Sequence, residues 1–160
     1  MKKLGKKLVA TLLAAVTVMA MSVTAFAATP TEDGSYSVTP TLYKDEACTE
    51  TSMGNDALVS AELEITGDTA TLYLTTKDLT VTRLGITVTG KLKSMILYDK
   101  AGTAHTAKMD EDDAYTFIVS DIPVSDIVEG VTFESTFEAT VSIIPVNMSG
   151  YLKLTNITAM

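Results

Sequence analysis

The sequence predicts an all-β, immunoglobulin-like sandwich of about seven to nine antiparallel strands, preceded by a cleaved signal peptide. Short runs of alternating apolar and polar residues, rich in Thr, Val and Ile, recur from residue 34 onward. Gly, Asn and Asp separate these runs, and no long stretch keeps a helical period. Because the chain has one Cys and no Trp, the Cys-Trp-Cys core of antibody domains is missing. The predicted likeness is therefore architectural.

The first 27 residues have the pattern of a secretory signal peptide. Four lysines precede an uncharged, mostly apolar stretch from Leu8 to Val23, and Ala25-Phe26-Ala27 forms a small-x-small cleavage site. The alternative is an uncleaved anchor, but the apolar stretch is shorter than the roughly 20 residues that a membrane helix needs. We expect a signal peptide over 1–27 and a single domain over 28–160, secreted or held at the cell envelope.

The charge of the mature chain limits its partners. Four of the 12 Lys and Arg residues but none of the 20 Asp and Glu residues precede residue 28, so 8 basic residues face 20 acidic ones, a net charge of −12. Such a surface repels nucleic acid and anionic lipid. No second long apolar segment follows, so we expect no membrane span after cleavage. The single Cys48 excludes an intrachain disulfide.

The first half of the domain contains three predicted strands. Residues 36–42 alternate as a half-buried strand, although Pro40 suggests a sheet edge or a break there. Residues 44–56 are polar and irregular, with a short turn at their end. Residues 59–65 and 70–74 alternate on either side of a Gly-Asp turn and predict a hairpin.

The second half contains further strands and two polar connections. The predicted strands cover 79–88, 92–98, 115–119, 131–144 and 151–157. Gly90 separates the first two. Residues 99–113 and 121–130 are expected to be loops, the latter with a possible helical turn. The segment Pro145–Gly150 is expected to turn the chain.

Few residues suggest catalysis, and we expect a protein that is not an enzyme. His105 is the single histidine and lies in a polar stretch, which favours an exposed residue over a catalytic one. The acidic run Asp110–Asp113 lacks the spacing of a calcium loop, so a solvated loop tip is favoured over a cation site. No cluster has zinc-ligand spacing.

Three segments resemble a known family in their order and spacing. These are Asp33-Gly34-Ser35-Tyr36, the Ser52-Met53 turn, and the predicted hairpin Val141–Leu154. Together they resemble the NEAT (near iron transporter) domains of Gram-positive haem-uptake proteins, over the whole mature chain. The resemblance implies an immunoglobulin-like sandwich that grips haem between a short helical lip and the last hairpin.

The resemblance also implies iron ligands, with one departure. Haem-binding members carry a Tyr-x-x-x-Tyr motif whose first Tyr ligates iron; here Tyr151 matches the second Tyr, and Asn147 stands in place of the first. Asparagine is a poor ligand for ferric iron. If the hairpin is one residue shorter, Met148 falls near the ligand position, and Met53 on the lip is a second candidate. The alternative is that this copy has lost iron ligation and binds another partner.

The implied cofactor is haem, and the implied function is to capture haem and pass it on to other haem-transfer proteins during iron acquisition. The alternative is a non-catalytic immunoglobulin-like surface domain that binds a protein or glycan. In the family that this chain resembles, members that bind haemoglobin carry an aromatic-rich segment at the lip. Residues 45–50 here are acidic and contain no aromatic residue, so the resemblance does not imply haemoglobin capture. Candidate iron ligands are Met148, Met53 and Tyr151, and the implied haem-contacting residues are Tyr43, Ser52, Met53, Leu58, Ile143, Met148 and Tyr151.

Overall fold

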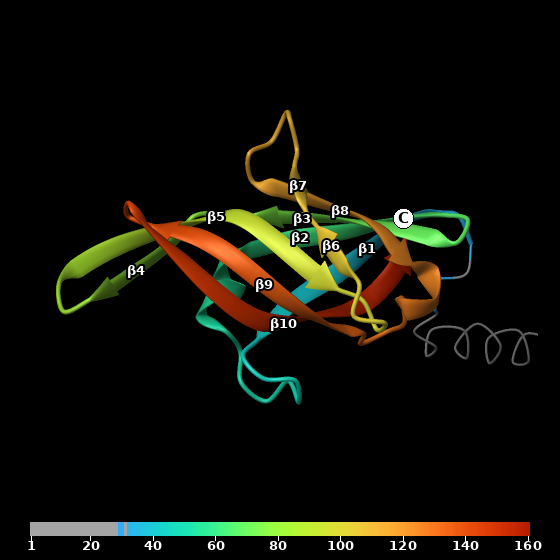
Figure 1. Ribbon diagram of the computed structural model, residues 1–160, viewed down its shortest axis with the longest axis horizontal. Helices are drawn as coiled ribbons and strands as arrows, with labels where there is room; N and C mark the ends of the chain where they lie inside the picture. Colours follow the sequence, from blue (N-terminus) through green and yellow to red (C-terminus); the bar gives the residue numbers. More distant parts are fainter. Residues whose placement is uncertain (1–28, 31) are drawn as a thin grey trace, which may run out of the picture.

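A computed structural model describes residues 29–30 and 32–160, so the expected signal peptide over 1–27 lies outside the described residues. The described chain is almost entirely antiparallel β-structure, which confirms the predicted fold class (Figure 1). Within this part, no helix is long and apolar enough to cross a membrane. The strands are β1 (Gly34–Tyr43), β2 (Leu58–Thr66), β3 (Thr69–Thr76), β4 (Leu79–Arg83), β5 (Ile86–Tyr98), β6 (Ala104–Thr106), β7 (Lys108–Met109), β8 (Thr116–Pro123), β9 (Thr132–Val141) and β10 (Ile144–Ala159). Two short 3-10 helices are η1 (Met53–Ala57) and η2 (Val124–Asp126).

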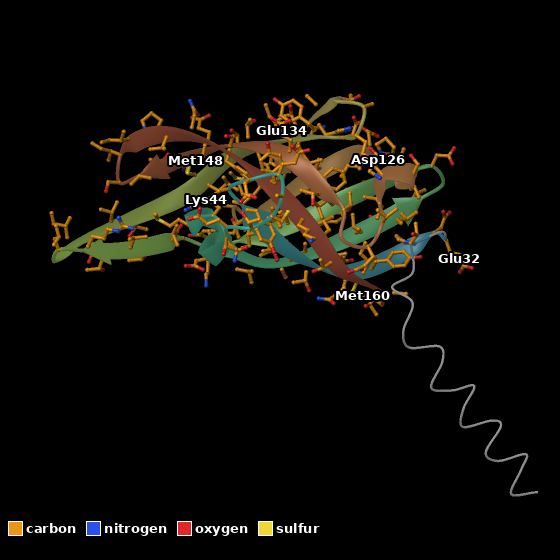
Figure 2. The ribbon with its side chains drawn as sticks, turned by 90° about the horizontal axis from the view of Figure 1, so that it is seen from below. Glu32, Lys44, Asp126, Glu134, Met148 and Met160 are labelled. Atoms are coloured by element: carbon orange, nitrogen blue, oxygen red, sulfur yellow. The ribbon has the colours of Figure 1, made fainter. Side chains whose placement is uncertain are left out.

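One continuous hydrogen-bonded path joins the two layers of the sandwich. Its order is β4-β5-β9-β10-β1-β2-β3-β8-β7, and β6 pairs with β5. The first half of β10 pairs with β9, and its second half pairs with β1. Strand β10 therefore passes from one layer to the other. The ends of the described chain, labelled at Glu32 and Met160, lie opposite the tip of the β4–β5 hairpin (Figures 1 and 2).

The core lies between the layers and receives alternate residues from each. Leu63, Leu72 and Phe117 come from one layer, and Met95 and Phe133 come from the other; all are almost completely buried. The hairpin predicted around Gly67 is confirmed as β2–β3, and Gly67 has a φ of 59°, which glycine adopts at little cost. Alternation thus identified the buried face of these strands correctly.

Strand β1 lies between β10 and β2, which corrects the expectation of an edge strand, but at Pro40 the pairing with β2 has ended, as expected for a residue without an N–H. Strand β2 pairs with β1 only as far as Val38, whereas β10 pairs with β1 as far as Tyr43. Pro40 lies just beyond the last β2 pair and is opposite Leu154 of β10. A residue without an N–H is tolerated there because no β2 partner needs it.

The expected separation of two strands at Gly90 and the expected turn over Pro145–Gly150 are both strand instead. Strand β5 runs through Gly90 without interruption, and the turn of its hairpin lies at Leu84 and Gly85, both with positive φ. Likewise, Pro145–Gly150 belongs to β10, because the chain reverses earlier. The β9–β10 turn lies at Ser142 and Ile143, so Ile143 is 90% exposed at the tip instead of sharing the inner face of β9.

The polar connection expected over 99–113 contains β6 and β7. His105 lies on a strand, β6, but its side chain is mostly buried and not exposed as expected. Its ring bonds Asp99 Oδ2 through Nε2 (3.0 Å) and Ser120 O through Nδ1 (3.1 Å). The hydrogen bond from His105, with the backbone N–H of Thr103, holds the pKa of Asp99 below its usual value. His105 thereby joins β6 to β8, a structural role.

Candidate functional site

An open, mainly apolar groove of about 280 Å³ lies at one end of the sandwich. Helix η1 forms one side, and the consecutive strands β4, β5, β9 and β10 of the sheet form the other. Apolar clefts with few polar groups are the usual form of small-molecule sites. The groove is lined by Leu42, Ser52, Met53, Gly54, Ala57, Leu58, Thr76, Leu79, Val81, Val88, Gly90, Lys91, Leu92, Phe137, Ala139, Val141 and Met148.

Helix η1 forms a lip that is hydrogen bonded to the end of β1. The Ser52 side chain accepts from the N–H of Gly54 (3.2 Å) and so caps the helix. The N–H of Ser52 donates to Leu42 O (2.8 Å), and the N–H of Leu42 donates to Asn55 Oδ1 (2.9 Å). Two bonds in opposite directions therefore fix the lip, and with it Met53, against the sandwich.

Glycines keep parts of this end of the sandwich close together. A Cβ on Gly54 would lie 3.2 Å from the Leu42 side chain. On the opposite wall, Gly90 presents bare backbone to the groove, where a Cβ would find its nearest neighbour, Val141, at 3.7 Å. No side chain projects from the groove wall at Gly90, and a methyl group would fit there at ordinary contact distance.

The two faces of β10 have different surroundings. Met148 pairs with Phe137, which pairs with the buried Met95, so Met148 belongs to the inner, groove-facing side. Met148 is 42% exposed and Met53 on the lip is 52% exposed. The groove thus has a partly exposed thioether on each side.

Tyr151 lies on the other side of β10. It pairs with Tyr43 and Glu134, whereas the next residue, Leu152, is fully buried. Successive residues of a strand point to opposite faces, so Tyr151, Tyr43 and Asn147 share the outer face. Tyr151, a candidate iron ligand, and Tyr43, an expected contact residue, therefore lie on the face of their strands that points away from the groove.

Of the residues expected from the sequence, the structure brings Ser52, Met53, Leu58 and Met148 together in the groove. Tyr43, Tyr151 and Ile143 do not line it. Sequence reasoning missed the contribution of the β4–β5 hairpin, including Leu79, Val81 and Val88. Their alternation was a readable signal of a strand, but nothing local indicated that the strand faces the lip.

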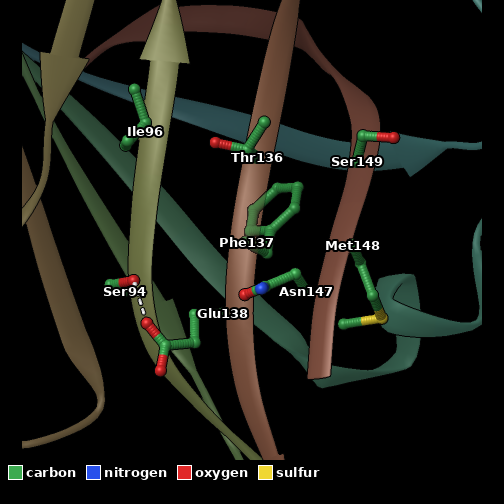
Figure 3. Close-up of a pocket in the computed structure, with 8 residues that line it drawn as sticks. All are labelled: Ser94, Ile96, Thr136, Phe137, Glu138, Asn147, Met148 and Ser149. Carbon is green, nitrogen blue, oxygen red and sulfur yellow. Dashed lines mark hydrogen bonds between the residues drawn. The ribbon is translucent and has the colours of Figure 1, made fainter. Parts of the chain in front are cut away.

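A second, shallower depression lies on the outer face of β5, β9 and β10. Figure 3 shows Ser94, Glu138 and Asn147 side by side across these strands, with a hydrogen bond from Ser94 to Glu138 (3.4 Å). Thr136 and Ser149 add hydroxyl groups to its lining. Ile96, Phe137 and Met148 complete the lining, so the depression mixes polar and apolar side chains and is more polar than the groove.

The groove is lined almost entirely by side chains that do not ionise. Among the described residues that line it, Lys91 alone has an ionisable side chain. Across residues 29–30 and 32–160, no group of three or more His, Cys, Asp or Glu side chains could hold a metal ion. General acid–base chemistry requires positioned proton donors and acceptors within hydrogen-bond reach of the reacting group. The arrangement suits binding of an apolar ligand.

Comparison with solved structures identifies the fold. The chain is similar to the NEAT5 domain of IsdX2, a B. anthracis hemophore in complex with haem, with a TM-score of 0.52 and 14% identity over 77% of this chain and 96% of that one. A mutant of the same domain, also in complex with haem, matches with a TM-score of 0.51 and 15% identity, over 78% and 95% of the two chains. No protein-family model and no curated protein matches the sequence. The likeness shows that the chain has a NEAT-like fold.

Proposed function

We propose that this chain, whose fold is NEAT-like, binds haem in the groove between η1 and the β9–β10 hairpin. The observation that carries the proposal is the apolar groove with Met53 on its lip and Met148 on its opposite wall. An apolar slot excludes water from a flat porphyrin, and thioether sulfur is an established axial ligand of haem iron. The haem-bound structures with the same fold add support.

The proposed ligands favour reduced iron. Thioether sulfur is a soft donor, and axial methionine raises the reduction potential of haem. Ligation by Met53, Met148 or both would therefore bind ferrous haem more tightly than ferric haem. The protein acts in this proposal by binding, as a secreted or envelope haem carrier that captures haem and passes it to other proteins during iron acquisition.

A haemin titration followed by absorbance tests the proposal. Mature protein should produce a Soret band distinct from free haemin, and reduction with dithionite should sharpen it. Met148→Ala and Met53→Ala should shift or weaken that band. Met109→Ala is the matched control, because Met109 is similarly exposed (40%) but lies on β7, outside the groove.

An unchanged free-haemin spectrum would reject haem binding. The runner-up function would then apply: a non-catalytic surface domain that binds a protein or glycan. The second depression, with Ser94, Glu138 and Asn147, favours such a role, because its amide, carboxylate and hydroxyl groups can hydrogen bond to sugar hydroxyls or peptide groups (Figure 3).

A further inference from the structure

Lys91 is the charged residue of an otherwise uncharged groove. It lies on β5 and pairs with Thr140 of β9. Its neighbours Gly90 and Leu92 pair with Val141 and Ala139, which also line the groove, so the Lys91 side chain leaves the strand on the other face and borders the groove from the edge of β5. A lysine beside an apolar cavity needs a counter-charge or an aromatic ring once a ligand displaces water from its surroundings.

The ammonium group of Lys91 lies over the ring of Tyr115, which is outside the groove lining. Lys91 Nζ lies 4.1 Å from the centre of the Tyr115 ring. The Tyr115 carbonyl accepts hydrogen bonds from both the N–H (2.8 Å) and the hydroxyl (2.9 Å) of Thr76, which itself lines the groove. Tyr115, and with it the Lys91 ammonium group, is therefore held on the Thr76 side of the groove.

No acidic residue neutralises this cation directly. Among the described residues, the recorded ion pairs join Lys44 to Glu50 and His105 to Asp99, and neither includes Lys91. Asp113 is the acidic residue whose pKa Lys91 affects, and its oxygens already accept bonds from the Thr116 hydroxyl (2.7 Å) and the Tyr115 N–H (3.0 Å). The Thr116 hydroxyl and the Tyr115 N–H lower the pKa of Asp113 more than Lys91 does.

We propose that Lys91 binds a carboxylate of the ligand that occupies the groove and so directs the acidic edge of the ligand toward Thr76. This inference rests on the proposed function, since porphyrin propionates are the carboxylates concerned. An ammonium group left without an ion pair, on a chain with 20 acidic and 12 basic residues, selects for an anionic ligand group at this position.

Haemin and haemin dimethyl ester distinguish this role from simple packing, because the ester lacks the carboxylates and retains the iron and the ring. Lys91→Met should weaken haemin binding about fivefold and leave binding of the ester unchanged. Lys91→Arg, which keeps the charge, should restore most of the haemin affinity. Lys93→Met is the matched control: this lysine is exposed on the same strand and does not line the groove.

The outcomes separate the two proposals. Failure of the wild-type protein to bind haemin would overturn the proposed function and this inference with it. Normal haemin binding by Lys91→Met would overturn the inference alone, as would an equal loss for haemin and its ester. A wild-type preference for haemin over the ester that disappears in Lys91→Met and declines with added salt would support it.

Discussion

Gly150 lies where β10 crosses from one layer to the other, and the structure predicts that even a methyl group there is destabilising. A Cβ at this position would lie 2.9 Å from Tyr43 O and 3.1 Å from Leu42 Cδ1. The first contact involves backbone and cannot be relieved by a side-chain rotation. Strand β1 or β10 must shift, so we expect Gly150→Ala to lower the free energy of unfolding by about 1–3 kcal/mol.

Gly90→Ala is the matched control, because it makes the same chemical change in another strand. The nearest atoms to the added Cβ are Val141 Cγ2 at 3.7 Å and two backbone oxygens at 3.9 Å, all at ordinary contact distance. Alanine restricts the unfolded chain more than glycine does, so we expect a gain of about 0.5 kcal/mol. The two substitutions should therefore differ by about 1.5–3.5 kcal/mol in the free energy of unfolding.

Urea unfolding of the mature protein measures this difference. In both variants the free energy of unfolding should fall with urea concentration at the wild-type slope. The unfolding midpoint should fall for Gly150→Ala and rise slightly for Gly90→Ala. Leu42 contacts both the Gly150 and the Gly54 positions and lines the groove, so Gly150→Ala should also weaken haemin binding. Midpoints that agree within error would refute the close approach of β1 and β10.

Three further predictions concern the groove, the lip and β6. Gly90→Leu should fill the groove and weaken haemin binding by about tenfold or more in an absorbance titration, whereas Gly90→Ala should bind as the wild type does. Asn55→Ala removes the acceptor of the Leu42 N–H and should lower the free energy of unfolding by about 1–2 kcal/mol in a denaturant titration, while an unchanged midpoint would contradict the anchoring role. The depressed pKa of Asp99 contributes stability that is present above the unfolded pKa of about 3.9 and is lost as pH falls through the lower folded pKa. His105→Phe removes the hydrogen bond that lowers this pKa, so its melting temperature should fall less steeply than that of the wild type between pH 5 and pH 2. Parallel plots of melting temperature against pH would argue against the bond.

Local alternation was sufficient to predict the fold class and the best-formed hairpin. In β2 and β3, apolar residues such as Leu63 and Leu72 recur at every second position, and this period alone identifies the buried face. The Ser52-Met53 turn was also recognisable, because a serine before a short helical turn is a common N-cap. These features depend on neighbouring residues, so the sequence determined them.

The composition of the groove depended on pairing that no local pattern contains. The predicted turn at Pro145–Gly150 obscured the continuous run of β10, and the strand period of two then decided which residues face the ligand. Aligning Tyr151 with the second Tyr of the Tyr-x-x-x-Tyr motif places Asn147 at the ligand position, but Asn147 lies on the outer face of β10. The pairing of Met148 with Phe137 shows that Met148, one residue later, lies on the inner face. One residue of offset thus exchanges the two faces of the strand.

The sequence by itself determined an all-β chain with more acidic than basic residues, a capped turn and a closing β-ribbon. Only the tertiary structure decided that the β4–β5 hairpin and Lys91 line the same groove as Met53 and Met148. The physical reason is that β-strands pair across long stretches of sequence. The neighbours of a groove residue are therefore set by sheet order and register, and not by the residues beside it in the chain.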